Sequence, residues 1–283
     1  MMQKLLIFQS LWAMERRHTD GFERSLDENI AMISEAGFDG ISAHYTNRRD
    51  VIRLNDATRG TGLKIEAVCF PRCVDDLRLP LELAAEFPVS HINLQPDIRP
   101  RRIEACLPLL DGWMRLAGEA GIPVFIETHR DRMTTDLFFT LDLLDRRPEL
   151  PLLADLSHYL VGREFAFPVD EENHVLIHRI LQNAHAFHGR VASREQVQIE
   201  ISFPHHRTWV DLFLQWWEYG FRHWRSRAAD DAELVFTCEL GPKPYAITGR
   251  DGNDQTDRWA EALALRQMIR ELWVATGLEA AAP

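Results

Sequence analysis

The sequence lacks several features that mark common classes of protein. It has no run of about 18 apolar residues, the length that a membrane-spanning helix needs. Its formal net charge of −11 argues against a basic surface for holding nucleic acid. Its four cysteines have neither zinc-ribbon nor secreted-scaffold spacing. We therefore expect a cytoplasmic protein with reduced thiols that binds neither nucleic acid nor a membrane.

A nucleotide-binding turn is also missing. The first apolar segment, at 4–9, is followed by SLWAMERRHTDGFERS, which contains no G-x-G-x-x-G motif. A doubly wound sheet ordinarily carries such a turn after its first strand. The N-terminal stretch has no small-residue cleavage site, so it reads better as a strand than as a signal peptide. A closed barrel is therefore favoured over an open sheet.

Apolar runs and amphipathic stretches alternate along all 283 residues. This alternation is typical of β/α units around a parallel sheet, and the length suits one large α/β domain. Strands are expected at 4–9, 39–44, 63–69, 90–95, 122–127, 151–155, 187–192 and 235–240. Helices are expected at 22–36, 51–61, 75–86, 101–120, 134–146, 172–183, 208–224 and 254–274.

Three glycines indicate where helices end and strands begin. Gly37, Gly62 and Gly121 each stand between a helical pattern and an apolar run, where a left-handed backbone conformation closes a helix. Eight strands with intervening helices predict a single-domain (β/α)8 TIM barrel over residues 1–276. Residues 277–283, with the sequence GLEAAAP, are expected to form a disordered tail.

Four residues of metal-binding type stand near the ends of short apolar runs. They are Glu127 closing IPVFIE, Asp155 closing PLLAD, His188 opening HGRVA and Glu239 closing VFTCE. A carboxylate at such a position is costly in an apolar core, but a cation can neutralise it. Because the carboxyl ends of barrel strands share one rim, we expect the four to converge on a metal. The alternative is that each is an isolated rim residue or ion-pair partner.

The chemistry of these ligands narrows the choice of metal. Three carboxylates and one imidazole suit an oxygen-tolerant divalent ion such as Mn²⁺, Mg²⁺ or Co²⁺ better than a structural zinc, which favours thiolates. We therefore expect one divalent cation, with catalytic Zn²⁺ left open.

Several polar residues near these ligands are candidates to bind a substrate. Gln95 ends an expected strand, His129 follows Glu127 by two residues, and Lys243 lies four residues beyond Glu239. The alternatives are a solvent-facing histidine at position 129 and a proline-fixed turn around Lys243. Trp12 and Phe70 follow expected strands, where they would form an aromatic wall for a bound ligand.

Two arginines follow His188 closely enough to hold a substrate oxygen or carboxylate through their fork of donors. Arg190 is expected to lie within the strand, where side chains alternate between faces, whereas Arg194 lies on the following loop. We therefore favour Arg194. His158 stands three residues beyond Asp155 and either reaches a metal-bound molecule or caps the segment that follows.

Together these motifs resemble the xylose-isomerase-like barrel superfamily, which includes sugar phosphate isomerases and epimerases, inosose dehydratase and endonuclease IV. The resemblance covers nearly the whole chain. It rests on ETHR at 127–130, D-x-x-H at 155–158, HGRV at 188–191, CELG at 238–241 and EAGFDGI at 35–41.

The resemblance implies roles for individual residues. Members similar to ketose 3-epimerases hold one divalent ion with Glu, Asp, His and Glu, and they grip the substrate with a His and an Arg. By position, the implied metal ligands are Glu127, Asp155, His188 and Glu239. His158 and Arg194 match the substrate-binding pair, and the two glutamates match the proton-transferring pair.

The expected function is therefore that of a metal-dependent isomerase or epimerase of a sugar or related polyhydroxy carbonyl compound. A metal-stabilised enediolate would form as Glu127 and Glu239 remove and return a proton. An inosose dehydratase-like reaction on the same ligands is the alternative. An endonuclease IV-like phosphoesterase needs more histidines and a basic groove, and a sugar-binding barrel without catalysis needs no proton-transferring pair.

The loop at 196–207, QVQIEISFPHHR, departs from the short substrate loop of the 3-epimerases. Its Gln196, His205, His206 and Arg207 predict either a different, more anionic pocket or a solvated excursion before the next helix. The expected partner is a small carbohydrate-like substrate. Because barrels of this kind often associate, a homodimer or homotetramer is also expected.

Overall fold

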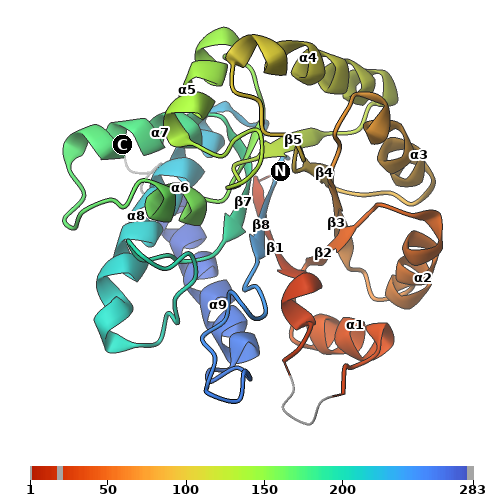
Figure 1. Ribbon diagram of the computed structural model, residues 1–283. Helices are drawn as coiled ribbons and strands as arrows, with labels where there is room; N and C mark the ends of the chain where they lie inside the picture. Colours follow the sequence, from red (N-terminus) through yellow and green to blue (C-terminus); the bar gives the residue numbers. More distant parts are fainter. Residues whose placement is uncertain (1, 18–21, 279–283) are drawn as a thin grey trace.

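Eight parallel strands close into a barrel in chain order, with β8 hydrogen-bonded to β1 (Figure 1). This computed structural model describes residues 2–17 and 22–278. The strands are β1 Lys4–Ser10, β2 Gly40–His44, β3 Lys64–Cys69, β4 His91–Leu94, β5 Val124–Glu127, β6 Leu152–Ala154, β7 Ala184–Gly189 and β8 Glu233–Cys238. The TIM barrel predicted from the alternation of patterns is confirmed.

Helices surround the barrel on the outside (Figure 1). They are α1 Leu26–Glu35, α2 Arg48–Thr58, α3 Arg78–Glu86, α4 Ile103–Ala120, α5 Leu137–Arg146, α6 Ser157–Gly162, α7 Glu171–Gln182, α8 Arg207–Arg227 and α9 Arg258–Leu278. α9 therefore includes residues 277 and 278, which were expected in the tail, and the remainder of that tail lies outside the described residues. No helix in the described part of the chain has the length and apolar character to cross a membrane.

The three helix-ending glycines adopt the predicted conformation. Gly37, Gly62 and Gly121 have φ of 76°, 76° and 67°, the left-handed region that a side chain disfavours. Gly40 is required for a different reason, which is close packing: a Cβ atom there would lie 2.4 Å from the ring of Phe8. Both features let short connections lead straight into tightly packed strands.

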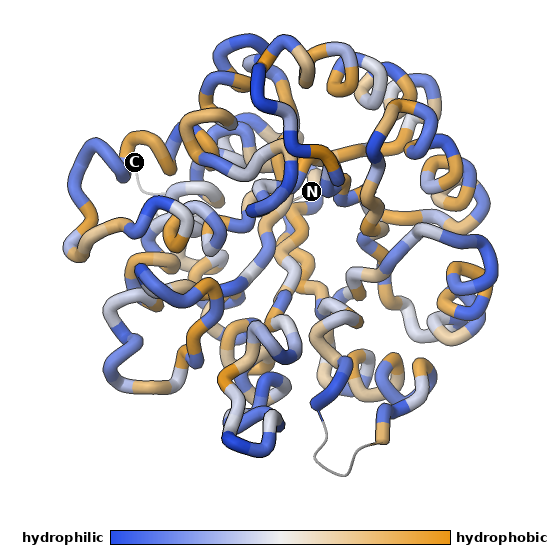
Figure 2. The backbone as a smooth tube through the Cα atoms, in the orientation of Figure 1, coloured by the Kyte–Doolittle hydropathy of each residue, from blue (hydrophilic) through white to orange (hydrophobic). Residues whose placement is uncertain are grey.

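Apolar side chains fill two separate spaces. A small cluster, formed by Phe8, Leu153, Ala186 and Val235, contains residues from β1, β6, β7 and β8. A much larger cluster packs the strands against the helices. Figure 2 shows the result, with mostly hydrophobic strands at the centre and outer helices of mixed character. Burial of both strand faces explains why several strands are almost continuously apolar.

The last two strands begin earlier than expected. β7 covers 184–189 instead of 187–192, and β8 covers 233–238 instead of 235–240. The apolar residues Val191 and Ala192 are buried, but they lie in the loop, where Val191 accepts a hydrogen bond from the amide of Ile199. Apolar character therefore continues past the end of the strand, and Arg190 lies just beyond β7 instead of within it.

Candidate metal centre

The four expected ligands meet at the carboxyl end of the barrel. Glu127 ends β5, Asp155 follows β6, His188 is the next-to-last residue of β7, and Glu239 follows β8. One possible ligand atom from each lies within 4.8 Å of those of the other three. The first three residues are fully buried, and Glu239 is 8% exposed. The isolated-residue alternative is therefore wrong, because the four form one cluster.

Neighbouring groups donate hydrogen bonds to one oxygen each of the Glu127 and Asp155 carboxylates, and the second oxygen of each accepts none from the residues that the structure describes. Glu127 Oε2 accepts hydrogen bonds from the amides of Asn93 and of Gln95, the latter at 2.7 Å. Asp155 Oδ1 accepts from the backbone N–H of Ser157 at 2.9 Å and from its hydroxyl at 2.5 Å. Within the described chain, Glu127 Oε1 and Asp155 Oδ2 are buried without a hydrogen-bond partner, although the Arg190 guanidinium lies 3.3 Å from Asp155 Oδ2. A buried carboxylate oxygen left in this way fits a cation.

Beneath the ligands, Glu66 on β3 holds His188 in place. Glu66 Oε1 lies 2.8 Å from His188 Nε2, and Oε2 lies 2.9 Å from His91 Nε2. The hydroxyl of Thr237 donates to the same carboxylate at 3.2 Å. If His188 donates its Nε2–H to Glu66, its Nδ1 lone pair faces the other ligands, which is the usual arrangement of a metal-binding histidine. Sequence reasoning missed Glu66, whose one signal was a charge inside a buried strand.

The electrostatics of the cluster show an excess of negative charge. Burial, together with the charges of Glu239 and Asp155, raises the pKa of Glu127. Although burial opposes it, the carboxylates of Glu239, Glu66 and Glu127 raise the pKa of His188 well above its usual value. Protons on these two groups would therefore offset part of the negative charge, and a bound divalent cation would offset it in their place.

Two further imidazoles lie beside the cluster. His158, the second residue of α6, is fully buried, and its ring lies 4.1 Å from that of His129. Neither ring nitrogen of His158 has a hydrogen-bond partner among the described residues, although Nε2 is 3.5 Å from Asp155 Oδ2. Burial lowers the pKa of both rings, that of His129 to about 4. The lowered pKa favours the neutral form of both rings; His158 caps no helix end, and His129 is half-buried in the wall of the cavity described below.

Arg190, and not Arg194, reaches the centre. Its guanidinium is 1% exposed, forms a short ion pair with Glu239 and lies 3.3 Å from Asp155 Oδ2. The Nε and one terminal nitrogen of Arg190 have no hydrogen-bond partner in the described structure. Arg194 is 45% exposed and lies near Glu164 and Glu195. The structure therefore brings Arg190 to the cluster and leaves Arg194 outside it, because β7 ends before Arg190 and the side chain of Arg190 turns inward.

Two other expectations about substrate binding are also corrected. Lys243 donates to the backbone carbonyl of Gly252 at 2.8 Å and does not line the cavity described below. No residue of 196–207 lines that cavity either. Gln198 instead bonds both the N–H and the carbonyl of Gly241, at 2.7 and 3.1 Å. Gln198 thus supports the turn after Glu239, whereas Gln196, His205 and Arg207 of the same loop are exposed, as the alternative of a solvated excursion expected.

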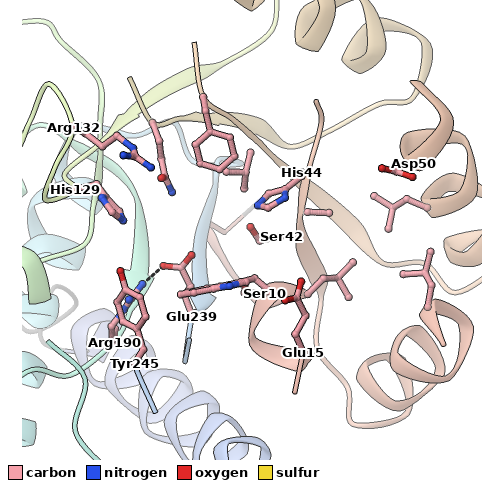
Figure 3. Close-up of a pocket in the computed structure, with 18 of the residues that line it drawn as sticks. Ser10, Glu15, Ser42, His44, Asp50, His129, Arg132, Arg190, Glu239 and Tyr245 are labelled. Atoms are coloured by element: carbon pink, nitrogen blue, oxygen red, sulfur yellow. Dashed lines mark hydrogen bonds and ion pairs between the residues drawn. The ribbon is translucent and has the colours of Figure 1, made fainter. Parts of the chain in front are cut away.

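A cavity of about 500 Å³ opens next to the ligand cluster (Figure 3). Glu239 is the ligand that lines it, together with Arg190, His129 and Gln95. Its wall also includes Trp12, Phe70, Tyr245, Ser10, Ser42 and His44. The rings of Trp12 and Tyr245 meet edge to face with centroids 5.3 Å apart. The expected aromatic wall of Trp12 and Phe70 is therefore present at the cavity.

These observations agree with the requirements of a divalent cation. The donor set is three carboxylates and one imidazole, the ligand atoms converge, and an unpartnered Glu127 oxygen is buried among them. Oxygen-rich sets of this kind favour Mg²⁺ or Mn²⁺. The residues present therefore fit such an ion.

No family model matches this chain, and no curated protein sequence matches it. Solved structures match it along nearly its whole length. A xylose isomerase-like TIM barrel protein from Mycobacterium smegmatis in complex with magnesium is 12% identical, with 96% of this chain and 97% of that chain covered and a TM-score of 0.62. A sugar phosphate isomerase/epimerase from Parabacteroides distasonis is 8% identical, with 96% and 95% covered and a TM-score of 0.59.

A third match is the 3-keto-D-glucoside 4-epimerase of E. coli, in its apo form. It is 14% identical, with 94% of this chain and 100% of that chain covered and a TM-score of 0.53. At such identities the likeness concerns the fold. The chain has the fold of the xylose isomerase-like TIM barrel proteins, as its motifs implied.

Proposed function

We propose that this protein is a divalent-metal-dependent isomerase or epimerase of a sugar or related polyhydroxy carbonyl compound. The observation that carries the proposal is the buried convergence of Glu127, Asp155, His188 and Glu239 beside a large cavity. Two of the matching structures are described as an isomerase/epimerase and as an epimerase of a keto-glucoside, and a third holds magnesium, which supports this choice.

The four converging residues would hold the ion, which would supply positive charge to stabilise negative charge developing on a carbonyl oxygen. Glu239 reaches the cavity and would exchange a proton with a substrate carbon. Glu127 lies deeper, with one oxygen fixed by Gln95 and the other free, and would serve as its partner in proton transfer.

Other side chains would orient the substrate. Arg190 keeps unpartnered N–H groups at the cavity, so it would donate hydrogen bonds to a substrate oxygen while its ion pair holds Glu239. His129 and Gln95 line the cavity, and His158 lies against His129. As neutral imidazoles, His129 and His158 can donate to, or accept from, a hydroxyl group without adding charge.

The proposal is tested by metal and product analysis together. The purified protein should bind about one equivalent of Mg²⁺ or Mn²⁺ per chain, measured by calorimetry after chelation. With metal supplied, it should convert at least one member of a panel of ketoses and keto-glycosides. Incorporation of deuterium from the solvent into the product shows that a carbon–hydrogen bond is cleaved. The identity of the product distinguishes epimerisation, isomerisation and dehydration. Absence of metal binding would contradict the proposal.

The variant Glu239→Gln tests the proposed role of Glu239 in proton transfer. This variant keeps the size of the side chain but removes the proton acceptor, so turnover and deuterium exchange should fall at least about 1000-fold, an effect typical of losing a catalytic base. Circular dichroism should show an unchanged fold. Retained turnover would remove Glu239 from the proton-transfer role.

A further inference from the structure

The cavity extends well beyond the metal-binding end. Glu239, Arg190 and His129 lie together at one end, while Asp50 of α2 lies farther out (Figure 3). Leu26 of α1 also belongs to the wall of this cavity. Because α1 and α2 belong to the outer ring of helices, the cavity runs from the barrel mouth into the helical layer. At about 500 Å³ it falls in the range that accommodates drug-sized ligands. A single sugar held at the cluster would leave the α1–α2 end unfilled.

The middle of the cavity offers apolar faces and neutral hydrogen-bonding groups. Trp12 and Tyr245 are half-buried and pack edge to face. Trp12 can lie so close to the turn after β8 because residue 241 is glycine, where a Cβ atom would be 2.4 Å from the indole ring. The hydroxyls of Ser10 and Ser42 line the same cavity. Aromatic faces beside neutral hydroxyls suit the apolar faces and hydroxyl groups of a sugar chain.

The charges of the wall are balanced. The carboxylates in the lining are those of Glu15, Asp50 and Glu239, and the guanidinium groups are those of Arg53, Arg132 and Arg190. Arg132 lies 3.4 Å from Asp97, and Arg190 is paired with Glu239, so two of the three cations already face a carboxylate. A lining with equal numbers of opposite charges does not favour a phosphate.

The position of the outer end points the same way. Phosphate sites of TIM barrels frequently lie at the loops after the seventh and eighth strands, beside a helix N-terminus. This cavity instead extends toward the helices that follow β1 and β2, where Glu15, Asp50 and Arg53, two carboxylates and one guanidinium, are exposed in its wall. Carboxylates accept hydrogen bonds from sugar hydroxyls but repel a phosphate.

Resting on the proposed function, we infer that the substrate is a neutral keto-glycoside. Its carbonyl-bearing sugar binds at the metal end, and a second sugar unit linked to it occupies the α1–α2 end, where Arg53 and Asp50 hydrogen-bond its hydroxyls. The metal end therefore sets the reaction, and the outer end sets the length and charge of the substrate.

The test compares three probes on Mg²⁺-loaded protein by calorimetry: a keto-hexose, a disaccharide that contains the same keto-hexose, and the phosphate ester of that keto-hexose. The disaccharide should bind at least about tenfold more tightly than either of the others. Equal or weaker binding of the disaccharide, preference for the phosphate, or no binding of any probe to the metal-loaded protein would overturn the inference. Failure to bind Mg²⁺ would instead overturn the proposed function.

A pair of variants on α2 localises the second sugar. Arg53→Ala should reduce the ratio of disaccharide to keto-hexose affinity by about fivefold or more. Arg49→Ala removes the same side chain from the same helix at a position that does not line the cavity, and it should leave that ratio unchanged. Equal ratios in the two variants would contradict a second sugar at this end.

Discussion

The two sides of the barrel mouth are built in opposite ways. On the β5–β8 side, the candidate ligands are at most 8% exposed, and each is held by hydrogen bonds or ion pairs from neighbouring side chains. On the side of α1 and α2, residues such as Glu15, Asp50 and Arg53 are exposed in the wall of an open cavity. A dense polar cluster fixes reacting groups precisely, whereas an open wall is free to vary with the substrate.

Among the variants that compare the two sides, the largest effect is expected at Arg190, which lines the cavity and pairs with Glu239. Arg190→Met should lower kcat/KM at least about 100-fold, because removing a preorganised donor from a buried site commonly costs that much. Arg194→Met serves as the control and should stay within about twofold of wild type, since Arg194 is exposed and away from the cavity. Equal losses in the two variants would restore the importance of Arg194. Circular dichroism and thermal melting would establish that both variants fold.

The next effect concerns the support under the metal ligands. Glu66→Gln keeps the shape of the side chain but removes the charge that faces His188, so the Kd for Mg²⁺ should increase by about 10–100-fold. Thr237→Val removes only a hydroxyl 3.2 Å from Glu66 and should have a smaller effect. Calorimetric titration measures both. An unchanged Kd in Glu66→Gln would show that His188 needs no carboxylate partner.

A smaller effect is expected in the open half. Trp12→Ala removes an aromatic face from the cavity and should raise KM for the accepted sugar by about fivefold, because aromatic contacts are worth about 1 kcal/mol. The value of kcat should change less, since Trp12 packs against Tyr245 in the cavity wall and is not one of the four clustered residues. Trp12→Phe should restore most of the affinity. A fall in kcat with unchanged KM would place Trp12 with the reacting groups instead.

The smallest effect lies outside both halves and concerns stability alone. Burial and the neighbouring Glu200 raise the pKa of Glu261 to about 9. The folded protein therefore binds a proton that the unfolded chain releases near its ordinary pKa of 4.5. Between those values the free energy of unfolding falls as the pH rises, because the folded state must keep that proton or bury a charge.

Glu261→Gln imitates the protonated acid, so it should remove this part of the pH dependence. Relative to wild type, its free energy of unfolding should be higher by about 1 kcal/mol or more at pH 8 and nearly equal at pH 4.5. Urea denaturation at the two pH values measures the difference. A difference that does not depend on pH would show that Glu261 is ionised in the folded protein. Activity should be unaffected, since Glu261 does not line the cavity.

Sequence reasoning located the four clustered residues because a carboxylate or imidazole at the end of an apolar run is visible without coordinates. It placed Arg190 wrongly because the end of β7 depends on pairing with β6 and β8, and β6–β7 pairing contains a register shift. It overlooked Glu66 because Lys64 and Glu66, two residues apart in KIEAVC, also fit the solvent face of a half-exposed strand. It assigned substrate recognition to 196–207 because loop composition does not tell which way a loop folds.

The sequence by itself determined the barrel, since the alternation of apolar patterns and the left-handed glycines act locally. It also determined that glutamate, aspartate and histidine side chains stand at successive strand ends. Only the closed sheet decided that Glu66 supports His188 from 122 residues away, and that the cavity extends to α1 and α2. The reason is physical: closure sets which strands face each other, and a buried charge is stable only with the partner that closure brings to it.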